Sequence, residues 1–226
     1  YLLSENNRKW KYFTAASIFL MLIASILSFS RGAYVGLIVA VSFFIFLFVK
    51  RSREISKLII SFLAIFLIAA VFFSGFVKNR LASSLNPREG SNAERIRNWE
   101  QAMDLIKVNS MSGVGLGNYA RSVDSLAPER SSIYAHNVFL DISAETGLLN
   151  VIIFFVLLLV SLAKHLRSGE NYGIGFSSAL VYFMVHGTFD TPIYSPQVFA
   201  VFMIIIAYSA SLPPKYRKEL NHTHGK

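Results

Sequence analysis

Six long runs of the chain contain no Asp, Glu, Lys or Arg, and apolar residues dominate each of them. They are residues 12–30, 32–49, 58–77, 146–163, 171–189 and 191–214, which are between 18 and 24 residues long. About 20 helical residues cross the hydrocarbon core of a bilayer, which is about 30 Å thick. Residues 58–73 read LIISFLAIFLIAAVFF, without the alternation of a membrane β-strand. The pattern predicts an all-α, polytopic membrane helical bundle with about six transmembrane helices.

The runs divide into two groups of three, in residues 12–77 and in residues 136–212, with a hydrophilic loop at residues 78–135 between them. Inside this loop, Ser91-Asn92-Ala93-Glu94 has the form of a helix capping box. The apolar residues that follow have a spacing close to one helical turn and predict an amphipathic helix; they are Ile96, Trp99, Met103 and Ile106. The helix is expected to end before the glycine-rich turn GVGLGN at residues 113–118. This turn has neither the preceding strand nor the Gly-Lys-Ser/Thr of a phosphate-binding loop, so we interpret it as a helix terminator.

The distribution of charge gives the expected orientation. Only 15% of the residues are charged, and the formal net charge is +9. The short segments on one side of the predicted bundle hold 13 Lys or Arg, whereas the short turns on the other side hold one. Short cytoplasmic loops retain Lys and Arg, so both ends, including the basic tail at residues 213–226, are expected in the cytoplasm and the long loop outside. The basic excess therefore predicts membrane topology and no nucleic-acid partner.

Ionisable groups close to membrane depth are candidates for function, because their desolvation is costly. Arg31 stands alone in a turn between two apolar runs. Its alternative role is an interfacial Arg that reaches lipid headgroups. Arg95 and Arg97 lie two positions apart on the amphipathic helix and hence on different faces. Their alternative role is that of ordinary solvated helix charges.

His136 directly precedes the fourth predicted helix. Asn137, Asp141 and Glu145 follow with a spacing of four residues, which places them on one face of an otherwise apolar helix. Such a polar stripe is expected to face a protein-lined cavity rather than lipid. The alternative is hydrogen bonding between helices that holds the bundle together.

A second pair, His186 and Asp190, repeats the four-residue spacing at the outer end of the fifth run, with the same two interpretations. The sequence has no His-Glu-x-x-His and no Asp-x-Asp, and its five His are scattered. We therefore expect no metal site and no cofactor. The chain contains no Cys, which excludes disulfides and thiolate chemistry.

Three blocks of sequence together resemble the bacterial O-antigen ligase and polymerase superfamily. They are SRGAYVGLIVA at residues 30–40, RIRNWEQAMDLIKVNSMSGVGLGNY at residues 95–119 and AHNVFLDISAETGLLNVIIF at residues 135–154. Two positions depart from the family's pattern: Ser110 stands where Pro is usual, and Asn150 where Gly is common. Members of the family are usually longer, and this chain begins at Tyr1 without Met, so residues 1–226 are expected to be one membrane domain from a longer protein.

The resemblance implies a metal-independent glycosyltransferase that moves a glycan from an undecaprenyl-diphosphate carrier to a glycan or lipid acceptor. This transfer occurs on the outer face of the inner membrane, in the biosynthesis of cell-surface polysaccharide such as lipopolysaccharide. By motif position Arg31 and Arg95 stabilise the leaving diphosphate, with Arg97 as a secondary candidate. His136 is the candidate base for the acceptor hydroxyl.

Asn137, Asp141, Glu145 and Asp190 are the expected substrate-binding residues. A ligase and a polymerase need the same groups, so the sequence leaves both open. A transporter or flippase for an anionic lipid-linked substrate is the alternative function. A transporter presents polar groups along its path at both leaflets, whereas the ionisable residues of the predicted spans lie almost wholly at their outer ends. This asymmetry favours the one-sided enzyme.

Overall fold

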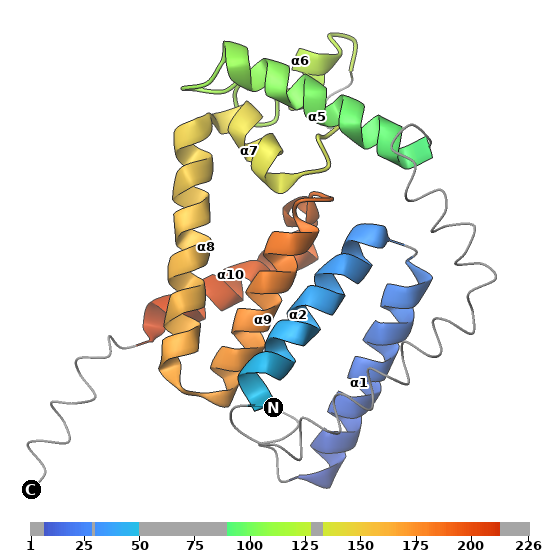
Figure 1. Ribbon diagram of the computed structural model, residues 1–226, viewed down its shortest axis with the longest axis vertical. Helices are drawn as coiled ribbons and strands as arrows, with labels where there is room; N and C mark the ends of the chain where they lie inside the picture. The colour runs from blue at the N-terminus through green and yellow to red at the C-terminus, as the bar shows by residue number, and fades with distance from the viewer. Residues whose placement is uncertain (1–6, 29, 50–89, 128–132, 213–226) are drawn as a thin grey trace, which may run out of the picture. The chain divides into compact units, whose positions relative to one another are not determined.

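The computed structural model describes residues 7–28, 30–49, 90–127 and 133–212. Their regular structure is helical, without a strand among the described residues, which confirms the all-α prediction. The elements are α1 (Arg8–Leu27), α2 (Arg31–Val49), α5 (Gly90–Val108), α6 (Tyr119–Val123), α7 (Val138–Thr146), α8 (Leu148–Ser168), α9 (Asn171–His186), the 3₁₀ helix η1 (Pro192–Tyr194) and α10 (Pro196–Ser211) (Figure 1). The third predicted span, residues 58–77, lies outside the described residues.

The chain forms two compact units, each described by itself. Unit 1 comprises Tyr1–Phe44, Val156–His186 and Tyr194–Lys226, and unit 2 comprises Ile45–Phe155 and Gly187–Ile193. Unit 2 contains the amphipathic helix and the start of the fourth apolar run. The division into spans, external loop and cytoplasmic tail stays a prediction.

Buried polar side chains join helices within unit 1. On α8, His165 is buried, and its Nε2 lies 3.1 Å from the carbonyl oxygen of Ile205 on α10. The Oγ of Ser209 on α10 donates a hydrogen bond to the Oγ of Ser161 on α8 at 3.0 Å. Tyr208 stacks on His165 with the rings 5.8 Å apart. Polar residues in these apolar helices thus link one helix to another, as expected where neither lipid nor water can satisfy them.

One described helix, α8, is long and apolar enough to cross a membrane, and most of its large apolar side chains are exposed. Two shorter apolar helices, Gly32–Phe48 and Pro196–Ser211, lie in the second and sixth predicted spans. The helix in the sixth run starts at Pro196, because proline is well tolerated in the first turn of a helix. A membrane helical bundle is compatible with these helices, and the number of six spans stays a prediction.

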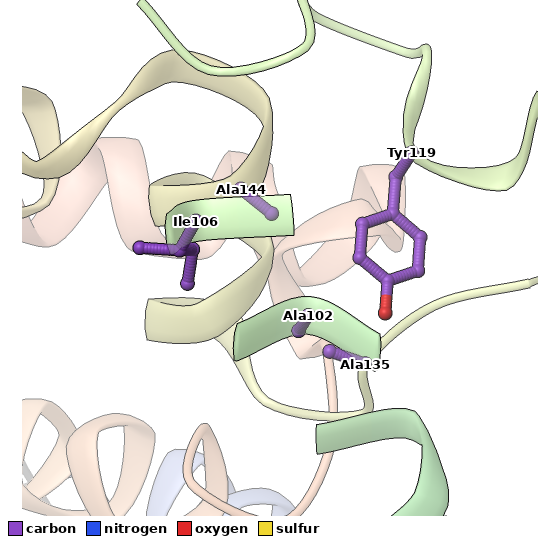
Figure 2. Close-up of a cluster of buried hydrophobic side chains, with 5 residues drawn as sticks. All are labelled: Ala102, Ile106, Tyr119, Ala135 and Ala144. Carbon is purple, nitrogen blue, oxygen red and sulfur yellow. The ribbon is translucent and has the colours of Figure 1, made fainter. Parts of the chain in front are cut away.

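In unit 2, α5 and α6 pack against α7 (Figure 1). The cluster at their contact combines one aromatic and one aliphatic side chain with three alanines (Figure 2); its members are Ala102, Ile106, Tyr119, Ala135 and Ala144. Because alanine side chains are short, they allow the backbones of α5 and α7 to approach closely.

The loop helix predicted from the sequence is α5, and it buries only part of its apolar stripe. Ile106 is buried and Trp99 packs against the cluster, as expected. Ile96 and Met103, which belong to the same apolar stripe, are 39% and 46% exposed. Ala102 is fully buried in the cluster, and its small side chain lies on the face of α5 that packs against α7. The helix begins at Gly90, one residue before the predicted cap.

Candidate functional site

The segment before α7 has an unusual backbone. His136 has a φ of 52° and is the one non-glycine residue with positive φ in the described part of the chain. Non-glycine residues adopt this left-handed conformation rarely, and it occurs where surrounding contacts enforce it, often at functional sites. Asn137 follows as the N-cap of α7, and its Oδ1 accepts hydrogen bonds from the amides of Phe139 and Leu140 at 3.0 and 3.2 Å. Capping therefore occupies the amide oxygen of one predicted substrate-binding residue.

The structure pairs His136 with Asp190. His136 Nδ1 lies 3.4 Å from Asp190 Oδ1, and the two side chains are 39% and 43% exposed. The same carboxylate oxygen accepts a hydrogen bond from the backbone amide of Thr191 at 2.8 Å, which fixes its position. With a proton on Nδ1, the ring donates to the carboxylate and leaves the lone pair of Nε2 free to accept a proton. Both side chains are open enough for a substrate to reach them.

This pairing corrects the expectation for Asp190. The sequence pattern paired it with His186 on one helix, but α9 ends at His186, and Asp190 lies in the turn that follows. A spacing of four residues places side chains together only while the helix continues. The partner of Asp190 is instead 54 positions away, a separation that no local pattern reveals.

Asp141 and Glu145 are buried in unit 2, with 1% and 6% exposure. Asp141 Oδ1 accepts a hydrogen bond from the amide of Ala135 at 2.8 Å, and Glu145 Oε1 accepts one from the amide of Tyr119 at 3.4 Å. Their face of α7 packs on protein, toward α5 and α6. Both carboxylates therefore hold backbone segments in place. Substrate binding by either residue stays a prediction.

The pKa of Asp141 is raised to about 7, mainly by burial. Hydrogen bonds from the amides of Ala135 and Asn137 lower this pKa, and the negative charges of Glu145 and Asp190 raise it. Burial, with a smaller contribution from Asp141, also raises the pKa of the Tyr119 hydroxyl far above its usual value. The interior of unit 2 thus disfavours negative charge.

The two arginines of α5 lie on different faces, as expected. Arg95 is half-buried, four positions before Trp99 and seven before Ala102, on the face of α5 that packs in unit 2. Arg97 is exposed. Arg31 is the first residue of α2, in unit 1, and its side chain lies outside the described part of the structure. That Arg31, Arg95 and His136 converge on one site stays a prediction.

The glycine-rich turn has a second role beyond ending α5. The amides of Val114 and Gly115 donate hydrogen bonds to the carbonyls of Ala144 and Glu145, at 2.8 and 2.9 Å, at the C-terminal end of α7. Gly113 has a φ of 65°, and a Cβ there would overlap the backbone of Glu145. We call this arrangement, residues 113–115 against the end of α7, the glycine clamp. The sequence predicted a turn here but not its partner.

The two departures from the family pattern also lie at the junction after α7. The carbonyl of Ser110 accepts a hydrogen bond from the amide of Leu148 at 2.9 Å. Asn150 Nδ2 donates to the carbonyl of Thr146 at 2.7 Å. Both residues therefore contact the break between α7 and α8, where Gly147 has a φ of 91°.

Helical structure in the described residues, a bilayer-length apolar helix and an accessible His–Asp pair fit the class of integral membrane enzymes. The family model described as O-antigen ligase matches residues 16–155, which is more than half of the chain. The chain belongs to the O-antigen ligase family, and the match contains all three blocks of the resemblance. No curated protein sequence matches the chain.

Family membership makes the protein an integral membrane protein with a ligase- or polymerase-type role in polysaccharide biosynthesis. Lipid-linked glycans and their acceptors are the general class of its partners. Within residues 7–28, 30–49, 90–127 and 133–212, no three His, Asp or Glu side chains lie together as a metal site would require.

Proposed function

We propose that the protein transfers a glycan from an undecaprenyl-diphosphate carrier to an acceptor hydroxyl at the outer face of the bacterial inner membrane. The acceptor oxygen loses its proton and attacks the anomeric carbon, while the bond from that carbon to the carrier diphosphate breaks. The reaction needs a base at the acceptor and positive charge at the diphosphate, which departs with the bonding electrons.

The contact of 3.4 Å between His136 and Asp190 is the observation that carries the proposal. A carboxylate beside an imidazole orients the ring and stabilises the imidazolium that forms when the ring takes a proton. The left-handed backbone of His136, with a φ of 52°, agrees with a side chain whose direction is under functional constraint. In this role His136 is the general base and Asp190 positions it.

Arg31 and Arg95 are the proposed contacts of the diphosphate. A guanidinium group donates two parallel hydrogen bonds to phosphate oxygens and keeps its charge at any physiological pH, so this proposed mechanism needs no metal or other cofactor. The half-buried position of Arg95 supports its assignment over the exposed Arg97. Asn137 keeps its Nδ2 group for a sugar hydroxyl, while its Oδ1 caps α7.

A reconstitution experiment tests the proposal. The full protein is placed in liposomes with a fluorescent undecaprenyl-diphosphate-linked oligosaccharide, and the release of free carrier and the formation of a larger glycan product are measured. The proposal expects carrier release that depends on an added acceptor. Movement of intact donor across the bilayer without release would instead support a flippase. Products identify the subclass: elongated lipid-linked glycan indicates a polymerase, and glycan on a different acceptor indicates a ligase.

The proposed outer-face site depends on topology, which reporter fusions can test. We expect fusions after Lys57 and Lys164 to report cytoplasmic positions and a fusion at Ser122 to report an external one. The basis is the 13-to-1 division of Lys and Arg between the short segments on the two sides. A cytoplasmic signal at Ser122 would place His136 and Arg95 on the side opposite to the one that the proposal requires.

A further inference from the structure

We propose that Asp141 is a positioning residue, whose carboxyl group accepts the Ala135 amide and thereby holds His136 in the conformation that meets Asp190. The contact between Asp141 and Ala135 is given by the geometry. Its importance for catalysis rests on the proposed function of His136. Asp141 does not touch the substrate in this account.

Two hydrogen bonds hold the chain on either side of His136. Asp141 Oδ1 lies 2.8 Å from the amide nitrogen of Ala135, which is the residue before His136. On the other side, the amide of Val138 donates a hydrogen bond to the carbonyl of Gly187 at 2.8 Å. Gly187 is three residues before Asp190 and lies in the same turn. One bond therefore fixes the chain before His136, and the other joins the segments that carry the base and its partner.

The backbone of His136 explains why an anchor is needed. A φ of 52° is unfavourable for a residue with a Cβ, by about 1–2 kcal/mol, so a free segment would leave this conformation. Ala135 is fully buried in the cluster of Figure 2, and its amide has no access to water there. Asp141 satisfies that amide, and the two effects together hold the segment in place.

Local structure alone does not account for an acidic residue at this position. Asp141 is 1% exposed, and its Oδ2 has no hydrogen-bond partner among the described residues. Burial of such a group is unfavourable by a few kcal/mol, and a role in positioning the base gives a reason for its presence despite this cost. The neighbouring Glu145 makes the same kind of contact with the amide of Tyr119, but that contact lies at the other end of α7 from His136.

Three variants separate the possible roles of Asp141. Asp141→Asn keeps an oxygen that can accept the Ala135 amide and removes the charge. Asp141→Ala removes the acceptor, and Asp141→Ser keeps a hydroxyl that is too short to reach. Ser143→Ala is the matched control, because Ser143 is also buried on α7 and its Oγ, among the described residues, donates to the carbonyl of Phe139 in the same helix.

The first measurement does not depend on any substrate. The chain contains no Cys, so the double change His136→Cys and Asp190→Cys introduces the only two thiols. Dibromobimane becomes fluorescent when it bridges two nearby thiols, and its rate of bridging reports how well the two positions stay together. We expect similar rates with Asp141, Asp141→Asn and Ser143→Ala, and a rate lower by about tenfold with Asp141→Ala or Asp141→Ser. Equal rates in all five proteins would overturn the inference.

The second measurement uses glycan transfer by the variants without the cysteine pair, per molecule of folded protein. Asp141→Ala should lower kcat by about tenfold or more and leave KM for the donor within about twofold, whereas Asp141→Asn should keep most of the kcat. Asp141→Ser replaces Asp141→Ala if the latter does not fold. A loss in Asp141→Asn equal to that in Asp141→Ala, or a normal kcat in a folded Asp141→Ala protein, would overturn the inference. If the unmodified protein releases no carrier, the proposed function fails, while the thiol-bridging rates still decide whether Asp141 positions residue 136.

Discussion

α7 and α8 follow one another along the chain and are separated only by Gly147, yet they differ in how much of each helix is buried. Five of the nine residues of α7 are buried, and three of these are the polar residues Asp141, Ser143 and Glu145. α8 has 21 residues, of which three are buried, and most of its exposed residues are large and apolar. α8 is thus suited to lipid on most sides, whereas α7 requires protein around it.

The difference shows where each helix is sensitive to substitution. On α8, replacing one exposed apolar side chain by another should change stability little, because lipid provides a similar environment for both. On α7, the buried carboxylates accept hydrogen bonds from backbone amides, among them Ala135 for Asp141 and Tyr119 for Glu145, so losing such a contact leaves a buried polar group unsatisfied. The candidate chemistry lies at the start of α7, next to the contact of Asp141 with Ala135.

The largest effect on the α7 region should come from the glycine clamp. Gly113→Ala forces a Cβ into the backbone of Glu145 at a φ of 65°, which we expect to lower the free energy of unfolding by about 3 kcal/mol or more. Gly117→Ala is the control, because Gly117 also has a positive φ of 77° but no atom within 4 Å of the added Cβ. It should lower that free energy by only about 1–2 kcal/mol. Equal losses in thermal unfolding of the two purified variants would show that the clamp does not stabilise α7.

The two faces of α5 extend the comparison to substrate binding. Arg95→Ala should weaken donor binding by about 10- to 100-fold, because it removes charge-assisted hydrogen bonds to the diphosphate. Arg95→Lys should recover only part of the loss, since it lacks the planar fork. Arg97→Ala, on the exposed face, should change donor affinity by no more than about twofold. Titration of labelled donor into detergent-solubilised protein measures these affinities, and a larger effect at Arg97 would move the diphosphate site to the other face.

A smaller effect is expected in the dependence of stability on pH. Asp141 has a folded-state pKa of about 7 against 3.8 for the free side chain, so the folded protein keeps a proton that the unfolded chain has released. The free energy of unfolding should therefore fall as pH rises from about 4 to about 7, by a few kcal/mol in total because a difference of one pKa unit corresponds to about 1.4 kcal/mol, and level off above that range. Asp141→Asn cannot ionise and should be more stable than the unmodified protein at pH 8 by that amount, with no difference near pH 4. A constant difference at all pH values would contradict the raised pKa.

Periodic patterns in the sequence predicted the helices well. The run at residues 191–214 contains α10, and the loop helix is present as α5, because both follow from the positions of proline, charge and apolar residues. The buried face of α5 was only partly predicted. The pattern of large apolar residues includes Ile96 and Met103, which are exposed in the structure. Close packing against α7 instead buries the small Ala102.

The candidate site could be predicted residue by residue but not as an arrangement. His136 and Asp190 were each found from chemistry and position, yet their contact depends on the turn after α9, where the helical spacing that suggested His186 as a partner ends. The backbone contacts of Asp141 and of the glycine clamp likewise depend on how distant segments pack. Spacing along the sequence carries no information on such contacts.

The central claim is that His136 accepts a proton from the acceptor while Asp190 holds its ring, and single-turnover transfer tests it most directly. Liposomes with bound labelled donor are mixed with acceptor, and the transfer rate and donor affinity are measured on the same preparations of unmodified, His136→Ala and Asp190→Ala protein. The account predicts a rate lower by about 10²- to 10⁴-fold for His136→Ala and a smaller loss for Asp190→Ala, with donor affinity within about twofold in both. Full transfer by a correctly inserted His136→Ala protein, or a loss explained entirely by weaker donor binding, would contradict it.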